Sequence, residues 1–262
     1  MVKKLTEIFR AFEGRLAEYA NEPHVWYLDW ALRYLPITRQ LMRDVMPCSN
    51  VLEIGCNNFG LRCFMAHRVV CVDLKFDRSI LGHFQTARVI GSVLWLPLTS
   101  ASSDFIVCVD TFEHLSSEDR QQAVIEILRV LKLGGKAFIA FPCGGAAESF
   151  DRSLWLSFRA RGIRVDWLEE HVQNKFPEAD EFVQALEKAS FSLHFKFELF
   201  QYKMNSMMLQ GMYVPILLKA RNHGTNLCAR ALLKAGLPLL NRFNWGPCYR
   251  RLFVVKKIES GA

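Results

Sequence analysis

The sequence predicts an α/β fold in which a doubly wound, mostly parallel sheet carries helices on both faces. From residue 51 onward, short apolar runs alternate with segments of helical periodicity, an order typical of strands joined by right-handed crossovers. The first run, VLEIGCNNFG at residues 51–60, stops on a glycine turn and restarts as a helix. Such a strand, loop and helix start is typical of a site for a nucleoside-type cofactor. We therefore expect a Rossmann-like sheet.

Length and composition favour one elaborated domain. The chain has 262 residues, of which 51% are apolar, and no linker rich in glycine, serine or proline interrupts it. We expect residues 1–50 to form an N-terminal helical cap and residues 51–262 to form the main domain. No uncharged apolar run reaches 18 residues, and the N-terminal pattern carries charges throughout, which argues against a signal peptide or a spanning helix and predicts a cytoplasmic protein.

The eight cysteines are scattered, without a CxxC pair or a spacing typical of zinc ligands. Several fall inside predicted strands. We therefore expect small core residues in a reducing compartment, and no metal site.

Helical patterns precede the first strand. Residues 1–20 place apolar side chains on one face, and an aromatic helical segment at 25–35 is expected to end at Pro36 before a further helix through Val45. Two interpretations stay open for the aromatic residues. They pack on the sheet edge, or Trp26, Tyr27 or Tyr34 covers the cofactor.

Strands are predicted at residues 51–55, 69–73, 87–91, 104–109 and 136–141. The clearest helix is predicted at 117–132, because Ser116 and Asp119 have the spacing of a capping box, and Gly134 and Gly135 form a stop.

After Pro142 the alternation is less regular. Residues 143–175 form a connection rich in aromatic and charged residues, and Pro177 begins a helical pattern, PEADEFVQALEKA. Two more strands are predicted at 191–200 and 249–257. Between them lies an insert at 200–247, which is too long for a bare loop and should contain its own helices.

The loop itself favours a ligand without phosphates. Gly55, Asn57 and Gly60 nearly match the dinucleotide fingerprint, but Asn57 replaces the glycine that lets a pyrophosphate approach the backbone. Glu53 would repel a pyrophosphate and attract the cationic amine of a methionine moiety. Asp73 follows at about the spacing expected of a ribose-binding acid. A nicotinamide oxidoreductase is therefore disfavoured.

Five motifs in order, VLEIGCNNFG, VVCVDL, SVLWLPL, DFIVCVDTFEHL and LRVLKLGGKAFIAFP, resemble those of class I S-adenosylmethionine-dependent methyltransferases of the methyltransferase type 11 branch. The resemblance covers about residues 50–142. It implies S-adenosyl-L-methionine as the cofactor and a seven-stranded sheet whose last strand is antiparallel.

The resemblance also implies a role for each motif position. Glu53 and Gly55 would lie under the methionine part, and Asp73 would bind both ribose hydroxyls. Leu74 would pack on the adenine. The remaining expected cofactor contacts are Cys56, Asn57 and Gly60 in the loop, Ser92 and Val93 beside the adenine, and Asp110 beside the methionine part. Cys56 and Gly60 could instead serve turn geometry alone.

Two departures from the family pattern leave an alternative open. Asn57 replaces a glycine, and Ser92 replaces the usual acid at the adenine amine. A catalytically degenerate regulatory module that only binds S-adenosylmethionine is that alternative.

Methyl transfer to a hydroxyl needs a group that removes a proton, and histidine is the natural base near neutral pH. His114 and His171 follow the carboxyl ends of predicted strands, where sites of α/β proteins form. Each could instead be structural: His114 by bonding to backbone at a helix start, and His171 within a charged surface turn.

The insert is the best sequence guide to the acceptor. The formal net charge of +7 lies entirely in residues 151–262, and residues 200–247 hold apolar clusters and no acidic residue. Such a surface suits anionic headgroups or phosphates, although the cations could merely be solvated. The insert and the preceding connection also resemble methyltransferases of bacterial surface-glycan and lipid pathways.

We therefore expect O-methylation of a small-molecule or lipid/glycan-linked acceptor, with peripheral contact at the inner membrane surface through residues 200–247. Nucleic acid is disfavoured as a partner, because the cations are sparse and the aromatic residues form no evident stacking platform.

Overall fold

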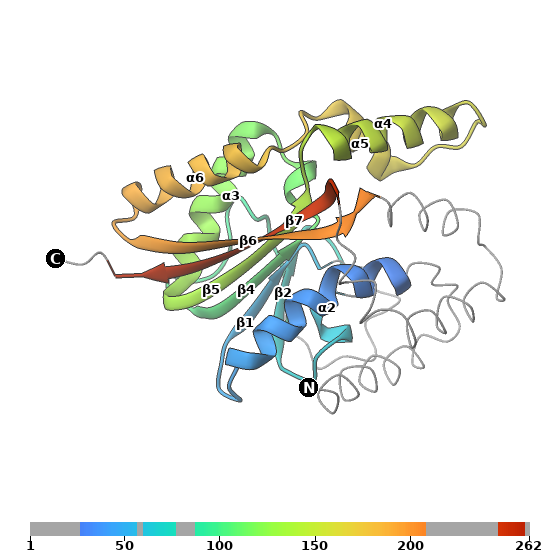
Figure 1. Ribbon diagram of the computed structural model, residues 1–262. Helices are drawn as coiled ribbons and strands as arrows, with labels where there is room; N and C mark the ends of the chain where they lie inside the picture. Colours follow the sequence, from blue (N-terminus) through green and yellow to red (C-terminus); the bar gives the residue numbers. More distant parts are fainter. Residues whose placement is uncertain (1–26, 57–59, 77–86, 208–245, 260–262) are drawn as a thin grey trace.

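The structure, a computed structural model, describes residues 27–56, 60–76, 87–207 and 246–259. A seven-stranded sheet with the order β3-β2-β1-β4-β5-β7-β6 forms its centre (Figure 1). The strands are β1 (Val51–Ile54), β2 (Val69–Asp73), β3 (Ala87–Ile90), β4 (Ser103–Val109), β5 (Leu131–Pro142), β6 (Lys196–Ser206) and β7 (Cys248–Ile258).

The sheet confirms the predicted α/β class and topology. Strands β1 to β5 pair in parallel, whereas β7 runs antiparallel to both β5 and β6. The pattern on β1 shows why the predicted strands are almost continuously apolar: Val51 belongs to the core on one face, and Leu52 to the core on the other.

One predicted strand was misplaced. Residues 191–200 were expected to be extended, but the helix α6 (Ala179–Ser192) continues into this segment and β6 begins only at Lys196. His194, in a left-handed conformation with φ of 52°, lies in the turn between them. Because β6 extends to Ser206, the connection to β7 is shorter than predicted, and its residues 208–245 lie outside the described part of the chain.

The helix α2 (Tyr27–Asp44) corrects a second prediction. Pro36 was expected to end a helix, yet it lies inside this one. A proline removes one backbone hydrogen bond, and here the apolar face of α2 offsets that cost: Leu32, Leu35, Ile37 and Leu41 are buried in the core that α2 shares with the sheet. The segment at residues 1–26 lies outside the described residues, so the proposed helical cap remains a prediction.

Helices α3 (Ser117–Val130) and α6 cover the opposite face of the sheet (Figure 1). The predicted cap of α3 is confirmed, since Ser116 Oγ accepts a hydrogen bond from the Asp119 backbone N–H at 3.2 Å. The helix ends at Val130, two residues earlier than predicted, because the chain becomes extended at Leu131 and joins β5.

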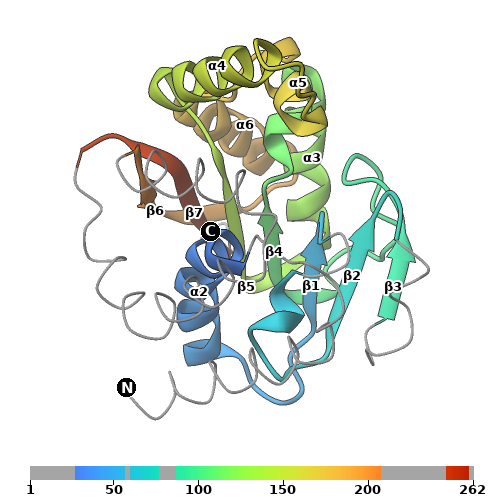
Figure 2. The same ribbon diagram turned by 90° about the vertical axis from the view of Figure 1, so that its right-hand side faces the viewer.

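Helices α4 (Gly145–Arg159) and α5 (Asp166–Gln173) occupy the connection in which the sequence predicted no regular element. They lie beyond the carboxyl ends of the parallel strands (Figure 2). The short helix η1 (Leu61–Cys63) follows the loop after β1, and η3 (Phe112–His114) follows β4. These elements bring the polar residues described below to one edge of the sheet.

Four of the cysteines are buried as predicted, namely Cys56, Cys71, Cys108 and Cys143, and none of these four forms a disulfide bond. Within the described ranges, no helix combines the length and apolar character needed to cross a membrane.

Candidate active site

The loop after β1 requires glycine at its first position. Gly55 has a φ of 71°, and its N–H donates a hydrogen bond to the Val72 carbonyl at 3.0 Å. A Cβ atom at this position would lie 2.2 Å from Thr111 Oγ1, which is closer than nonbonded atoms can approach. The close approach of the loop to the end of β4 therefore depends on the missing side chain.

Glu53 lies beneath the loop and holds its far end. Both carboxylate oxygens accept the Leu61 N–H, at 2.7 and 2.8 Å. Burial raises the pKa of Glu53 to about 7, although the Leu61 N–H and Tyr34 act in the opposite direction. The carboxyl group is thus engaged with the chain itself, and its predicted contact with the methionine part of a cofactor stays a prediction.

Gly60 belongs to the same arrangement. Its φ is 55°, and a Cβ atom there would lie 2.2 Å from Glu53 Oε1. The turn-geometry interpretation of this glycine is therefore supported, without excluding a ligand near its backbone. Asn57 lies outside the described residues.

The side chain of Cys56 is buried in the core rather than lying on the loop surface. Its neighbour Cys71 lies with its Sγ 3.9 Å from Glu53 Oε2, and one ligand-type atom from each of Glu53, Cys56 and Cys71 falls within 4.8 Å of the others. The hydrogen bond with Cys71, followed by burial, raises the pKa of the Cys56 thiol. Sequence spacing did not reveal this cluster, because its members come from β1, from the loop after it and from the adjacent strand β2.

Asp73 ends β2 at the edge of the sheet where the loop lies, and Leu74 follows it. Asp73 pairs in register with Ile90 of β3, and the Leu74 side chain is 72% exposed. An exposed apolar side chain at this place is compatible with the predicted packing on an adenine.

Ser92 and Val93 follow β3 at the same edge. Ser92 Oγ accepts the Leu94 N–H at 3.2 Å, so this hydroxyl stabilises a local turn. Val93 is buried in the core next to α3. Trp95 in the same turn is 72% exposed, and it was not among the predicted site residues.

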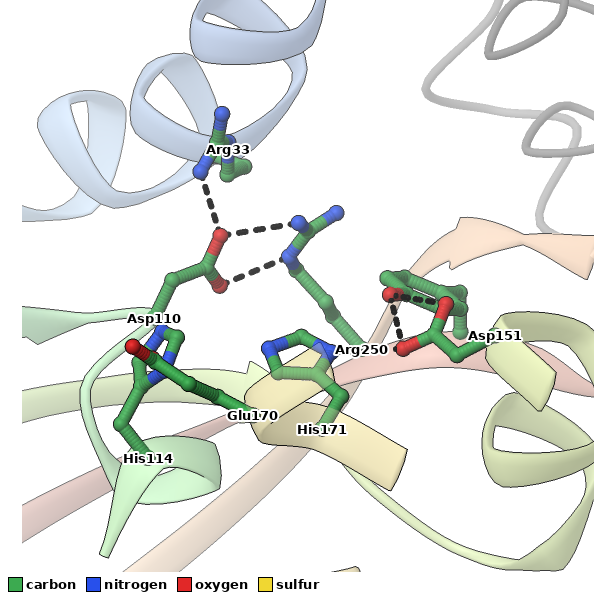
Figure 3. A network of polar contacts seen from close by, with 8 residues as sticks. Arg33, Asp110, His114, Asp151, Glu170, His171 and Arg250 are labelled. Carbon is green, nitrogen blue, oxygen red and sulfur yellow. Dashed lines mark hydrogen bonds and ion pairs between the residues drawn. The ribbon is translucent and has the colours of Figure 1, made fainter. Parts of the chain in front are cut away.

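Asp110 directly follows β4 and binds two arginines from distant parts of the chain (Figure 3). Its Oδ1 and Oδ2 accept from Arg250 Nε and Nη2 at 2.7 and 2.8 Å, and Oδ2 also contacts Arg33 of α2. Burial alone would raise the pKa of Asp110, but the charges of Arg250 and Arg33 outweigh it and lower the pKa to about 2. Neither arginine was predicted as a site residue.

His114 lies at the end of η3, next to Asp110. Its Nδ1 is 2.7 Å from Oε2 of Glu170, a residue of α5. Because a carboxylate accepts hydrogen bonds, Nδ1 carries the proton in the neutral ring and Nε2 has the lone pair. Burial, followed by the neighbouring His171, lowers the pKa of His114 even though Glu170 opposes this. The neutral ring is therefore the favoured form near pH 7.

His171 of α5 is held in the same way, but deep inside the protein. Its Nδ1 lies 2.7 Å from Oδ2 of Asp151 in α4, and Tyr249 Oη donates to the same carboxylate at 2.7 and 2.8 Å. The ring centroids of His171 and His114 are 5.1 Å apart, and the two rings lie side by side (Figure 3). The structure thus brings together the two histidines that the sequence selected, and adds Asp151 and Tyr249, which it did not.

Glu113, between Phe112 and His114, is 2% exposed. Burial, then the nearby Asp110, raises its pKa well above the usual range. Its Oε2 has no hydrogen-bond partner among the described residues. No sequence signal distinguished this glutamate from an ordinary residue at a helix start.

Comparison with known proteins agrees with this geometry. Residues 52–139 match the family model described as a methyltransferase domain. This stretch contains the glycine loop, Asp73 and Asp110, and it lies in a seven-stranded sheet with one antiparallel strand. Residues 52–139 therefore form a methyltransferase domain, and the sheet has the topology that the resemblance to class I S-adenosylmethionine-dependent methyltransferases implies.

Two curated proteins match part of the chain. A protein of Encephalitozoon cuniculi named as a methyltransferase is 36% identical over 124 residues, which are 46% of this chain and 56% of that protein. The tRNA (carboxymethyluridine(34)-5-O)-methyltransferase of Schizosaccharomyces pombe is 31% identical over 117 residues, 42% of this chain and 50% of that protein. The chain thus spans about half the length of the curated relatives it matches.

The fold is also similar to that of a solved enzyme, the phosphoethanolamine N-methyltransferase 2 of Haemonchus contortus in complex with phosphomonomethylethanolamine and S-adenosylhomocysteine. The TM-score is 0.54 at 14% identity, and the match covers 86% of this chain and 52% of that one. At this identity the likeness concerns the fold.

Proposed function

We propose that this protein is an S-adenosylmethionine-dependent methyltransferase that methylates an oxygen atom of its acceptor. The observation that carries the proposal is the pair His114 and His171, each oriented by a carboxyl group at the edge where β1, β2 and β4 end. Both rings keep an Nε2 atom that these hydrogen bonds do not use. Such a pair is suited to activating a hydroxyl group.

The cofactor would lie across the ends of β1 and β2. In this proposal the loop at Gly55 and Gly60 carries the methionine part, Asp73 binds the ribose hydroxyls, and Leu74 contacts the adenine. Asp110 contributes indirectly, because its carboxylate is already paired with two arginines. Titration calorimetry with S-adenosylmethionine should give binding that Asp73→Ala weakens at least tenfold. Clear binding of NAD without binding of S-adenosylmethionine would favour the oxidoreductase alternative instead.

The reaction needs little covalent participation by the protein. The acceptor oxygen attacks the methyl group in line with the carbon–sulfur bond, so most of the acceleration comes from holding the two reactants together. As the new carbon–oxygen bond forms, the carbon–sulfur bond breaks, the sulfonium becomes a neutral thioether and the hydroxyl loses its proton. The acceptor hydroxyl would bind next to the histidine pair, which lies beside Asp110.

A methylation assay with the histidine variants tests the catalytic assignment. His114→Ala and His171→Ala should each lower kcat by about 100-fold or more, while leaving S-adenosylmethionine binding within a few-fold of the original, if the rings act on the acceptor. His194→Ala is the matched control, since His194 lies on the turn before β6. Undiminished methylation in both variants would remove the histidines from the mechanism.

The same experiments separate an enzyme from a degenerate module. A regulatory module would bind S-adenosylmethionine with unchanged affinity in every histidine variant and would release no S-adenosylhomocysteine with any acceptor. Mass-spectrometric detection of S-adenosylhomocysteine during incubation with an acceptor panel supplies the deciding measurement.

The basic and apolar composition of residues 200–247 supports a small-molecule or lipid/glycan-linked acceptor met at an anionic surface. Vesicles containing anionic lipid should co-sediment the intact protein more strongly than a variant in which Lys219, Arg221, Arg230 and Lys234 are changed to glutamine. If the intact protein ignores anionic vesicles at low salt, peripheral contact with the inner membrane surface is excluded.

The relative from Schizosaccharomyces pombe favours a second candidate acceptor. Its name assigns it methylation of an oxygen of a modified uridine in tRNA, and it shares 31% identity with part of this chain. The acceptor panel should therefore include tRNA. If methyl groups enter tRNA but no lipid or small hydroxylated compound, the acceptor is a nucleoside of tRNA and the lipid-linked acceptor is excluded.

A further inference from the structure

The histidine pair and Glu113 form a cluster of three side chains with metal-binding atoms. One ligand-type atom from each of Glu113, His114 and His171 lies within 4.8 Å of the other two. Glu113 and His114 come from η3 after β4, whereas His171 comes from α5, so the fold and not the local sequence creates the cluster.

The hydrogen bonds of both imidazoles have the pattern that metal-bound histidines show. Metal-ligating histidines commonly donate one ring N–H to a carboxylate, which fixes the ring and makes the other nitrogen more basic. His114 Nδ1 is paired with Glu170 at 2.7 Å, and His171 Nδ1 with Asp151 at 2.7 Å. In both rings Nε2 is therefore the nitrogen with an available lone pair.

Glu113 supplies a second, independent observation. Its side chain is almost completely buried, and its Oε2 has no hydrogen-bond partner within the described ranges. A buried polar atom without a partner costs free energy, and a buried carboxylate normally pairs with a cation or a metal ion. A carboxylate oxygen within 4.8 Å of two imidazole nitrogens is well placed for the latter.

The surrounding charges also favour a cation. Arg33 and Arg250 would repel one, but Asp110 binds both of them. Glu113, Asp151 and Glu170 then remain as carboxyl groups around the histidines. Together with Asp110, four carboxyl groups therefore lie around the two histidines.

We propose that Glu113, His114 and His171 bind one divalent transition-metal ion, with Zn²⁺ as the best match. Two imidazole nitrogens and one carboxylate oxygen suit Zn²⁺, Co²⁺ or Mn²⁺, whereas Mg²⁺ and Ca²⁺ prefer oxygen ligands alone. Three protein ligands also leave coordination positions open, as in catalytic metal sites.

The role of this ion rests on the proposed methyltransferase function. An acceptor hydroxyl bound at an open position would lose its proton more readily, and that proton would leave to solvent. The resulting oxygen would attack the methyl group, the carbon–sulfur bond would break with its electrons on sulfur, and neutral S-adenosylhomocysteine would result. The histidines would then act as ligands that activate the acceptor.

Metal binding can be measured without cofactor or acceptor. The full-length protein, stripped with a chelator, should bind one equivalent of ZnCl₂ in titration calorimetry. His114→Ala and Glu113→Gln should each weaken this binding at least tenfold, and His171→Ala should abolish it. His194→Ala should leave the affinity unchanged. His114→Ala is the safest of these variants, because the His114 side chain is one-third exposed and its removal should not unfold the protein.

Titration with CoCl₂ distinguishes this cluster from the one at Glu53, Cys56 and Cys71. Nitrogen and oxygen ligation should give only weak visible bands, whereas thiolate ligation would add intense sulfur-to-metal absorption. The proposal is overturned if the intact protein binds no equivalent of Zn²⁺, if folded His114→Ala and Glu113→Gln bind as tightly as the original, or if strong thiolate absorption accounts for the bound ion.

The two proposals fail in different ways. If the stripped protein transfers methyl groups at the full rate and regains nothing with Zn²⁺, the ion has no role in methylation but the methyltransferase proposal stands. If no acceptor is methylated while one equivalent of Zn²⁺ binds and His114→Ala weakens it, the metal site stands without the enzyme.

Discussion

Asp110 Oδ1 accepts a hydrogen bond from Arg250 Nε at 2.7 Å, and this pair joins the end of β4 to β7 across 140 residues of sequence. Both side chains are largely buried, and Arg33 of α2 contacts the same carboxylate. The three charged groups therefore connect α2, the centre of the sheet and its antiparallel strand beside the histidine pair. Asp110, for which the resemblance implies a cofactor contact, thus also connects three elements of the fold.

Replacing Asp110 by asparagine should strongly destabilise the fold. Without the carboxylate, two buried guanidinium groups lose their counter-charge, and breaking a buried pair in this way costs about 3–5 kcal/mol. Urea denaturation at pH 7 measures the loss. Asp104→Asn is the matched control. Asp104 of β4 also forms an ion pair, with Lys132, but both side chains are roughly one-third exposed. Its loss should therefore lower the free energy of unfolding by only about 1 kcal/mol. Equal losses in the two variants would contradict the importance of burial.

The buried Glu53 should make the stability fall as the pH rises. Its pKa is raised to about 7 in the folded protein, against an ordinary value of 4.5, so ionisation is disfavoured by folding. The contribution is fully present below pH 4.5 and is lost as the pH rises through 7. The shift corresponds to a loss on the order of 3 kcal/mol.

Glu53→Gln keeps an oxygen that can accept the Leu61 N–H and removes the titration. Denaturation curves between pH 4.5 and 7.5 should therefore converge or cross, with the variant losing less stability than the original across this window. Parallel curves for the two proteins would show that Glu53 does not titrate there.

The sequence predicted those parts of the fold and of the site whose residues lie close together in the chain. The glycine loop, Asp73 and the ends of the strands lie within short motifs whose order indicates both the sheet and the cofactor. The same motifs led to His114, because it lies in the segment that follows β4. Pro36 shows the limit of such rules: its local preference was to end a helix, but the burial of neighbouring side chains of α2 offsets the loss of one hydrogen bond.

The remainder of the site depends on contacts between distant residues. Tyr249 meets Asp151 across 98 residues, and Arg250 meets Asp110 across 140. An isolated tyrosine, aspartate or arginine has no periodicity or spacing that reveals such a partner. His171 was selected for its chemical type and its place after a strand, but the buried carboxylate that orients it could be found only in the fold.

Gly60→Ala should disturb the loop far more than an ordinary glycine substitution. The new Cβ would lie 2.2 and 2.5 Å from the two oxygens of Glu53, which the Leu61 N–H holds in place. With the positive φ in addition, we expect a loss of at least about 2 kcal/mol in stability and a tenfold or greater loss in S-adenosylmethionine affinity. Denaturation and calorimetry measure the two effects.

Gly134→Ala is the control for Gly60. Gly134 also has a positive φ, 77°, but a Cβ there would meet no atom within 4 Å. Only the backbone cost of about 1 kcal/mol should appear, with unchanged cofactor affinity. If both variants bind S-adenosylmethionine as the original protein does, the close packing of Glu53 against Gly60 has no part in forming the cofactor site.

Tyr249→Phe should separate positioning from direct participation in the reaction. The Tyr249 hydroxyl donates to both oxygens of Asp151, which in turn fixes His171 through Nδ1. Its removal leaves the ring packed against Phe150 and takes away one of the donors that hold Asp151. We expect a fall in kcat of about tenfold, as for other residues that orient a functional histidine, with a small change in KM for S-adenosylmethionine. Tyr202→Phe, at an exposed position of β6, should leave kcat unchanged. A Tyr249→Phe variant that loses about 1 kcal/mol of stability but keeps its full kcat would limit this hydrogen bond to the stability of the fold.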